Sequence, residues 1–201
     1  MPTLLENATI PRILFVRHGE TDWNVEGRLQ GQTDIPLNPL GRIQAEEVGR
    51  RLAKLIENPA QSQWLVSPLG RTRETAEIAR RALGLEPMAY ETDDRLKEIT
   101  FGSWEGFTWA ELRKKDPLIE TTRNQQKWDY VPPKGESYEM LTQRLKPWVE
   151  TIVEERVVVS HGGVARALMA MLTDIPVHDA PRQDIHQGRV LVFENNRFKW
   201  H

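Results

Sequence analysis

Three short, uninterrupted apolar runs in this chain each end directly in a cluster of polar residues. The runs occupy residues 13–16, 64–66 and 157–159. A continuous apolar run of this length predicts a strand that is buried on both faces, as in a parallel sheet. Because apolar residues at helical spacing follow each run, the chain alternates strand and helix, which predicts an α/β fold.

The segments between and after these runs predict how the sheet is covered. Helices are expected from Asn38-Pro39 to about residue 58, from about residue 75 to Gly84, from Ser137 to about residue 152, and from Gly162 to residue 172. Further strands are expected at residues 88–92 and, as an edge strand, at residues 189–194. These elements predict a three-layer α/β/α sandwich with a largely parallel sheet and helices on both faces.

Residues 107–134 interrupt this alternation. The pairs Asp116-Pro117 and Pro132-Pro133 favour turns, so we expect an excursion that carries one short helix and covers the mouth of a cleft. The chain shows no repeat, linker or low-complexity segment. We therefore expect residues 1–201 to form a single domain that begins with a short arm at residues 1–11.

The charge and composition of the chain exclude several classes of function. The formal net charge is −2, so the overall field gives no reason to expect nucleic acid or an anionic membrane as a partner. The chain has no cysteine, which excludes disulfides, thiolate metal sites and cysteine nucleophiles. The first residues do not form the basic and apolar segments of a signal peptide. A cytoplasmic protein is expected.

Three polar clusters follow the strands, at the edge where ligands bind in open α/β sheets. They are Arg17-His18-Gly19, Ser67 to Arg71, and Ser160 to Gly163. The topology thus gathers two histidines and two arginines beside glycines whose backbone N–H groups can approach a ligand closely. Because an arginine fork binds two phosphate oxygens at once, Arg17 and Arg71 can replace a metal ion. The sequence predicts a site for a small phosphate ester that needs neither metal nor cofactor.

These side chains suit phosphoryl transfer through a nitrogen nucleophile. His18 is expected to be the nucleophile, because the two neighbouring arginines disfavour its protonated form. One of its ring nitrogens is expected to be held by a local backbone carbonyl, while His161 donates to a phosphate oxygen. The leaving group needs a proton from a carboxylic acid in the same cleft, and Glu98 and Glu105 are both candidates.

Five motifs together resemble those of the histidine phosphatase, or phosphoglycerate mutase-like, superfamily. They are Leu14-Phe15-Val16-Arg17-His18-Gly19-Glu20-Thr21 with Asn24 and Leu29-Gln30-Gly31, Ser67-Pro68-Leu69-Gly70-Arg71-Thr72, Leu96-Lys97-Glu98 with Gly102-Ser103-Trp104-Glu105-Gly106, Gly135-Glu136-Ser137, and Val159-Ser160-His161-Gly162-Gly163. The resemblance extends over nearly the whole chain and implies a phosphoglycerate mutase-like fold.

The resemblance also implies roles for individual residues. His18 is implied to be the phosphorylated nucleophile, and Glu98 the proton donor. The other implied positions surround the phosphate: Arg17, Arg71 and His161 as its main contacts, Asn24 and Gln30 in the pocket lining, and Gly162 through its backbone N–H.

Two alternatives stand beside a phosphatase of small phosphate monoesters. A phosphoglycerate mutase is less favoured, because mutases of this family carry a longer insertion where this chain has residues 107–134. A module that only binds a phosphorylated ligand is disfavoured because His18 and Glu98 are both present. His186 is a further candidate, since residues 183–187 can return to the cleft. The excursion also holds basic residues that could bind an acidic substrate, namely Arg113, Lys114, Lys115, Arg123 and Lys127.

Overall fold

A six-stranded sheet forms the centre of the protein in a computed structural model that describes residues 10–201. Most of the predicted N-terminal arm lies outside the described residues. The strands are β1 (Ile13–Arg17), β2 (Gln63–Val66), β3 (Glu91–Thr92), β4 (Arg156–Ser160), β5 (Val190–Glu194) and β6 (Arg197–Trp200), in the order β3-β2-β4-β1-β5-β6. The three predicted apolar runs form β1, β2 and β4, which pair in parallel with β4 in the middle.

The end of the chain departs from the prediction, because β5 lies inside the sheet and not at its edge. It pairs antiparallel with β1 on one side and with β6 on the other. The prediction lacks β6, which forms because Asn195 and Asn196 adopt φ angles of 52° and 58°. Two residues in this left-handed conformation make the tight turn that a hairpin requires. The sheet is therefore largely parallel, with an antiparallel hairpin at one edge.

The strand predicted at residues 88–92 is also corrected, since β3 contains only Glu91 and Thr92. The residues before it form turns: the Ala89 N–H donates to the Glu86 carbonyl and the Tyr90 N–H to the Met88 carbonyl. Residues in these turns are not extended. Only Glu91 and Thr92 are extended and pair with β2.

Seven α-helices are described, and four of them confirm the predicted helices. The helices are α1 (Asp22–Val25), α2 (Pro39–Leu55), α3 (Gly70–Ala82), α4 (Trp109–Lys115), α5 (Ile119–Gln125), α6 (Tyr138–Val149) and α7 (Gly162–Leu172). Short 3₁₀ turns occupy Pro59–Gln61, Asp94–Leu96, Gly102–Trp104 and Ala180–Arg182. The predicted caps are present, because Asn38 accepts from the Gly41 N–H at 2.8 Å and Ser137 from the Met140 N–H at 3.2 Å.

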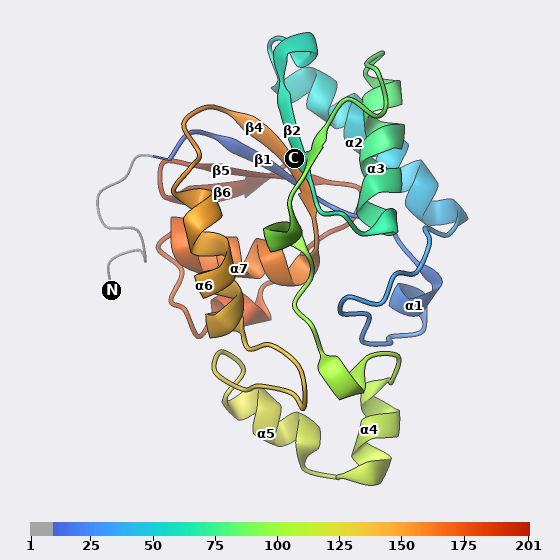
Figure 1. The fold of residues 1–201 in the computed structure, drawn as a ribbon, viewed down its shortest axis with the longest axis vertical. Coiled ribbons are helices and arrows are strands. Elements are labelled where there is room, and N and C mark those ends of the chain that lie inside the picture. The colour runs from blue at the N-terminus through green and yellow to red at the C-terminus, as the bar shows by residue number, and fades with distance from the viewer. Residues whose placement is uncertain (1–9) are drawn as a thin grey trace.

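The excursion at residues 107–134 carries two helices, α4 and α5, where the sequence predicts one. Thr108 and Glu111 form a reciprocal capping box at the start of α4, and Asp116-Pro117 then separates it from α5. Figure 1 shows both helices at one end of the molecule, beyond α1 and α6. No helix within residues 10–201 has the length and apolar character that a membrane span requires.

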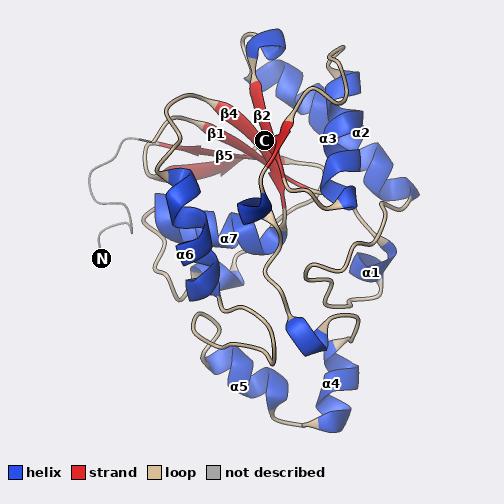
Figure 2. Cartoon of the chain, in the orientation of Figure 1, coloured by secondary structure: helices blue, strands red, loops and turns tan. Residues whose placement is uncertain are grey.

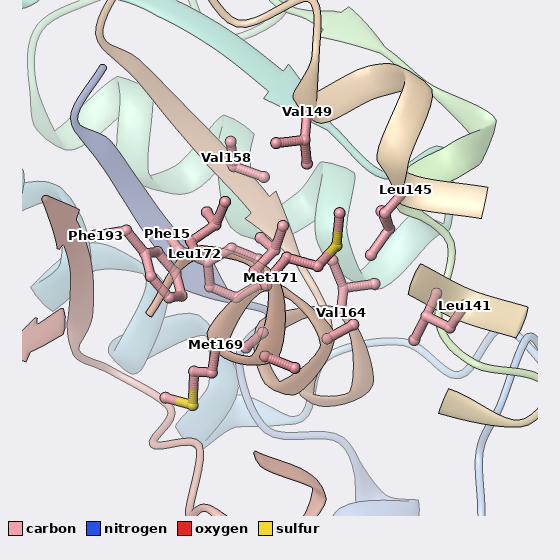
Figure 3. Close-up of a cluster of buried hydrophobic side chains, with 14 of the residues drawn as sticks. Phe15, Leu141, Leu145, Val149, Val158, Val164, Met169, Met171, Leu172 and Phe193 are labelled. Atoms are coloured by element: carbon pink, nitrogen blue, oxygen red, sulfur yellow. The ribbon is translucent and has the colours of Figure 1, made fainter. Parts of the chain in front are cut away.

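Two apolar clusters hold the helices to the sheet, one on each face. Figure 2 shows α6 and α7 on one side of the strands and α2 and α3 on the other. Alternate strand residues point to alternate faces: Phe15 joins the cluster beneath α6 and α7, whereas Leu14 and Val16 join the cluster beneath α2 and α3. Figure 3 shows α6 and α7 side chains meeting those of β1, β4 and β5. The predicted three-layer architecture is confirmed, and the ends of β1, β2 and β4 are fixed between two packed layers.

The close contact between α2 and α3 gives a test of this packing. A side chain at Gly49 would lie 2.5 Å from the Ala79 carbonyl oxygen and 2.7 Å from the Ala82 Cβ. Overpacking of this kind destabilises by about 1–3 kcal/mol, which exceeds the gain of about 1 kcal/mol from the better helix propensity of alanine. We expect Gly49→Ala to lower the free energy of unfolding, measured by urea denaturation.

Lys54→Ala on the same helix is the matched control, because Lys54 is exposed. Its effect should stay within about 0.5 kcal/mol. A Gly49→Ala protein as stable as the parent would show that the two helices can separate at no cost.

Candidate active site

The polar residues at the ends of β1, β2 and β4 form one buried cluster. Arg17, the last residue of β1, is the register partner of Ser160, the last residue of β4. His18 and His161 follow these strands directly, and their ring centroids lie 5.3 Å apart. Arg71 lies in the first turn of α3, just after β2. The structure therefore brings together the two histidines and two arginines that the strand ends predict.

The His18 ring is held in a defined tautomer. Its Nδ1 lies 2.7 Å from the Gly19 carbonyl oxygen, and because a carbonyl only accepts, Nδ1 carries the hydrogen. Burial, followed by the charges of Arg71 and Arg17, lowers the pKa of His18 well below its ordinary value. The ring is thus neutral near pH 7, with an unprotonated Nε2.

His161 is oriented by a residue for which the sequence predicts no separate role. The Ser67 hydroxyl lies 2.7 Å from His161 Nε2, and both residues are fully buried. Burial also lowers the pKa of His161 well below its ordinary value, with Arg71 and His18 contributing. The buried Nδ1 of His161 has no hydrogen-bond partner within residues 10–201. This nitrogen can meet a ligand.

The two arginines are held chiefly by backbone carbonyls. Arg71 donates to the Thr33 carbonyl at 2.8 Å and the Gly31 carbonyl at 2.7 Å, and Arg17 donates to the Ile185 carbonyl at 2.8 Å. Arg71 also lies 3.6 Å from the exposed carboxylate of Asp34. In both arginines, Nε is buried and lacks a partner within the described residues.

Both guanidinium groups stay positively charged. Burial lowers the pKa of Arg17 to about 10, and the charge of Glu98 opposes this shift. Burial likewise lowers the pKa of Arg71, again opposed by Glu98. The cluster therefore presents two positive charges to a ligand near neutral pH.

The two candidate acids have different surroundings. Glu98 Oε1 accepts from the backbone N–H groups of Ile99 and Gly163, each at 2.9 Å, which places the carboxylate against the start of α7. A side chain at Gly163 would lie 2.3 Å from the same oxygen, so only glycine leaves room for Glu98. Glu98 is therefore fixed beside the histidines and arginines.

Glu105 instead holds two loops together through hydrogen bonds, one at residues 32–33 and one at residues 100–101. Its oxygens accept from the Gln32 N–H, the Thr33 N–H and hydroxyl, the Thr100 hydroxyl and the Phe101 N–H. These five donors engage both carboxylate oxygens within the protein, so neither oxygen is free to meet a leaving group. The geometry favours Glu98 over Glu105 as the proton donor.

The other three predicted site residues, Gln30, Gly162 and Asn24, differ in how free they are to contact a ligand. Gln30 is buried, and its Oε1 has no partner within residues 10–201. Gly162 is the first residue of α7, beside Arg17. Asn24 Oδ1 accepts from the Thr21 N–H at 3.2 Å, so part of its side chain serves to cap α1.

Residues 183–187 contact the site, as predicted, but His186 is not one of the residues that make the contact. The exposed His186 ring packs edge-on against Trp200, with centroids 4.8 Å apart. The contacts come from its neighbours: the Ile185 carbonyl accepts from Arg17, and Gln187 Nε2 donates to the His18 carbonyl at 3.1 Å and to Asn24 Oδ1 at 3.0 Å. A glutamine in a loop carries no sequence signal for such contacts.

The chain is similar to proteins that are named as phosphatases and to proteins that are named as phosphoglycerate mutases. It is 35% identical over 170 residues to a metal-independent phosphoserine phosphatase of Arabidopsis thaliana, covering 82% of this chain and 69% of that protein. It is 34% identical over 200 residues to a probable phosphoglycerate mutase of Klebsiella pneumoniae, covering 94% of this chain and 87% of that one.

The fold matches solved phosphatases. A mycobacterial glucosyl-3-phosphoglycerate phosphatase, solved with VO3, superposes with a TM-score of 0.80 at 29% identity, covering 95% of this chain and 96% of the other. The family model of the histidine phosphatase superfamily (branch 1) matches residues 13–201. With the strand-end cluster in place, these matches show that the chain belongs to the histidine phosphatase superfamily.

Proposed function

We propose that this chain hydrolyses small phosphate monoesters through a phosphohistidine on Nε2 of His18. The observation that carries the proposal is a neutral, buried histidine, held at Nδ1 by the Gly19 carbonyl and placed beside two arginines. Such a ring has one free lone pair, and the neighbouring positive charges attract the phosphate that it attacks.

The reaction takes two steps. In the first, Nε2 of His18 forms a bond to phosphorus while the ester oxygen leaves with a proton from the carboxylic acid of Glu98. In the second, the Glu98 carboxylate takes a proton from water, the water oxygen bonds to phosphorus, and the bond to Nε2 breaks. Inorganic phosphate leaves and both residues return to their starting states.

Three groups can stabilise the charge on the equatorial phosphate oxygens. They are Nε of Arg17, Nε of Arg71 and Nδ1 of His161, which are buried and have no hydrogen-bond partner among residues 10–201. For the third, we assign the Ser67 hydroxyl as the donor to His161 Nε2, which lies 2.7 Å away; this assignment places the ring hydrogen on Nδ1. The backbone N–H groups at the start of α7 add a favourable dipole.

The proposal favours hydrolysis over mutase action and over simple binding. The compact cover of α4 and α5 leaves less material to exclude water from a phosphoenzyme than the longer insertion expected of a mutase. A module that only binds phosphate has no use for a carboxylate fixed at Gly163 beside a neutral histidine. The phosphatases among the similar proteins support the same choice.

Metal independence is part of the proposal, because two arginines supply the charge that a cation otherwise provides. The similar phosphoserine phosphatase carries metal independence in its name. The cytoplasmic location and the absence of nucleic-acid and membrane partners stay predictions, as does the single-domain organisation.

The nucleophile is tested by trapping the intermediate. We expect His18→Ala to abolish turnover of p-nitrophenyl phosphate, because no other free imidazole nitrogen occupies the position of Nε2. In acid, a phosphohistidine decays whereas it survives base, so a quenched wild-type reaction should contain a base-stable, acid-labile adduct. Peptide mapping by mass spectrometry should place the phosphate on His18. An adduct on another residue would falsify this mechanism.

The proton donor is tested by varying the leaving group. We expect Glu98→Gln to slow hydrolysis of alkyl phosphates by about a hundred- to ten-thousandfold, the usual contribution of general acid–base catalysis. Formation of the His18 adduct from p-nitrophenyl phosphate should be much less affected, because nitrophenolate leaves without a proton. Rapid-quench kinetics on the two esters give the comparison.

Glu105→Gln is the matched control for Glu98→Gln. Because Glu105 braces loops, this variant should lower the melting temperature and reduce activity on both esters by similar factors. Leaving-group dependence in Glu105→Gln, with none in Glu98→Gln, would reverse the assignment.

Metal independence is tested by exhaustive chelation. The arginines supply the positive charge, so we expect full activity after dialysis against EDTA and inhibition by vanadate, an analogue of the trigonal phosphoryl group. The steady-state rate before and after readdition of Mg²⁺, Mn²⁺ or Zn²⁺ is the measurement. Activity that disappears with EDTA and returns with one of these ions would contradict the proposal.

A further inference from the structure

The proposed proton donor, Glu98, lies on a segment whose backbone is held by side chains from other elements. We call residues 95–98 the acid segment. Its first two residues end the 3₁₀ turn Asp94–Leu96, and its last two belong to no helix or strand. All four of its carbonyl groups accept hydrogen bonds from side chains outside the segment. The donors are Arg144 on α6, Ser160 at the end of β4, and Gln32 in the loop before α2.

Arg144 contacts three of these four carbonyl groups. It donates through Nη1 to the carbonyls of Arg95, at 2.5 Å, and Lys97, at 3.1 Å, and through Nη2 to the Glu98 carbonyl at 3.4 Å. Helix α6 is fixed by its apolar side chains in the core. A segment without regular backbone pairing keeps its position only as well as such contacts hold it, so Arg144 ties the acid segment to the core.

Glu136 holds the Arg144 guanidinium in this orientation. Its Oε1 and Oε2 accept from Nε and Nη2 of Arg144 at 2.8 and 2.9 Å, which leaves Nη1 to meet the carbonyls. The Glu136 N–H also donates to the Thr100 carbonyl at 2.9 Å. The two side chains of the ion pair are only 22% and 14% exposed, so solvent screens it less than a surface pair. Glu136 belongs to the motif Gly135-Glu136-Ser137, to which the mechanism above gives no role.

The Glu98 carboxylate depends on this backbone for its place. Its Oε1 accepts from the Ile99 and Gly163 N–H groups at 2.9 Å each, so a displacement of the acid segment takes the carboxylate away from the start of α7. A misplacement of about 1 Å can cost an enzyme about a hundredfold in rate. The hydrogen bonds of Arg144 within residues 10–201 go only to the acid segment and to Glu136. These contacts can affect the reaction only through Glu98.

We propose that Arg144, oriented by Glu136, is a positioning residue for the proton donor. It fixes the acid segment so that the Glu98 carboxylate stays at the start of α7, where it meets the leaving oxygen. The inference rests on the proposed function, in which Glu98 protonates that oxygen. It gives the motif Gly135-Glu136-Ser137 a role in catalysis that is exerted through two other residues.

Kinetics with two esters test this role. We define the leaving-group ratio as kcat/KM for p-nitrophenyl phosphate divided by kcat/KM for ethyl phosphate. Arg144→Gln should raise this ratio by about tenfold or more, which is part of the hundred- to ten-thousandfold contribution of general acid–base catalysis. The reason is that ethoxide needs the proton and nitrophenolate does not. Glu136→Gln keeps the size of the side chain and weakens the ion pair, so it should raise the ratio less and is the variant that best preserves the fold.

The same substitution in a Glu98→Gln background shows whether Arg144 acts through Glu98. Once the acid is absent its position no longer matters, so adding Arg144→Gln should change the ratio by no more than about twofold. A general loss of structure gives a different result, because it lowers kcat/KM for both esters by the same factor and leaves the ratio unchanged in either background.

Amide hydrogen exchange reports on the position of Glu98 without turnover. The Gly163 N–H lies in the first turn of α7, where a helix provides no carbonyl partner, and it donates to the Glu98 carboxylate instead. Exchange at Gly163, followed by NMR, should be about tenfold or more faster in Arg144→Gln than in the parent, the usual effect of losing a charged hydrogen bond.

Arg12→Gln is the matched control. Arg12 also combines an ion pair, with Glu155 at 3.0 Å, and a bond to a backbone carbonyl, that of Leu55 at 2.7 Å, and its side chain is 27% exposed. It directly precedes β1, whereas the site follows the last residue of this strand. This variant should lower the melting temperature and leave both the leaving-group ratio and the exchange at Gly163 unchanged.

Three results would overturn the inference: an unchanged leaving-group ratio in both Arg144→Gln and Glu136→Gln, a rise of the ratio that persists in the Glu98→Gln background, or parental exchange at Gly163 in Arg144→Gln. Failure of the proposed function looks different. In that case the parent does not hydrolyse p-nitrophenyl phosphate, or Glu98→Gln itself leaves the ratio unchanged. Exchange at Gly163 still reports then whether Arg144 fixes Glu98.

Discussion

The need to bury two positive charges constrains the loops around this site. Moving a guanidinium out of water costs several kcal/mol unless hydrogen bonds replace the lost hydration. In this protein backbone carbonyls provide most of the replacement: Arg71 is held by Gly31 and Thr33, and Arg17 by Ile185. Glu105 then fixes the first of these loops through Gln32 and Thr33. The loop that contains Gly31 and Thr33 and the loop that contains Ile185 are far apart in sequence. Their positions are set by the arginines to which they donate carbonyl contacts, and these contacts leave the positive charge in place.

The same charges explain how the histidines can serve in catalysis. Positive neighbours and burial keep His18 and His161 neutral, so one ring can attack and the other can donate without a net charge of its own. Carbonyl ligands suit this arrangement better than carboxylates would, because a carboxylate against each arginine would cancel the charge that attracts phosphate. Two carboxylates lie near the arginines: the exposed Asp34 is 3.6 Å from Arg71, and Glu98 is held beside them by bonds to two backbone N–H groups without a direct ion pair.

How far the sequence predicts this structure depends on the range of the interactions involved. The apolar runs predict β1, β2 and β4, and their polar ends predict the histidines and arginines, because each signal lies within a few consecutive residues. The placement of β5 inside the sheet, the contact of Ser67 with His161, and the return of Ile185 and Gln187 to the site all depend on residues far apart in the chain. The Asn195-Asn196 turn is different, since its residue types do signal a hairpin and could have predicted β6.

Helix α7 connects the apolar core to the charged groups of the site. Every residue of α7 except Arg166 is buried, so the helix is fixed by the core on almost all sides. Its first turn holds Glu98 through the Gly163 N–H. One turn later, Arg166 borders the same point as Arg17, since a side chain at Gly162 would have Arg166 Nη1 at 3.5 Å and Arg17 Nε at 3.7 Å. Because the core fixes α7, Glu98 and Arg166 are both held at constant positions relative to Arg17.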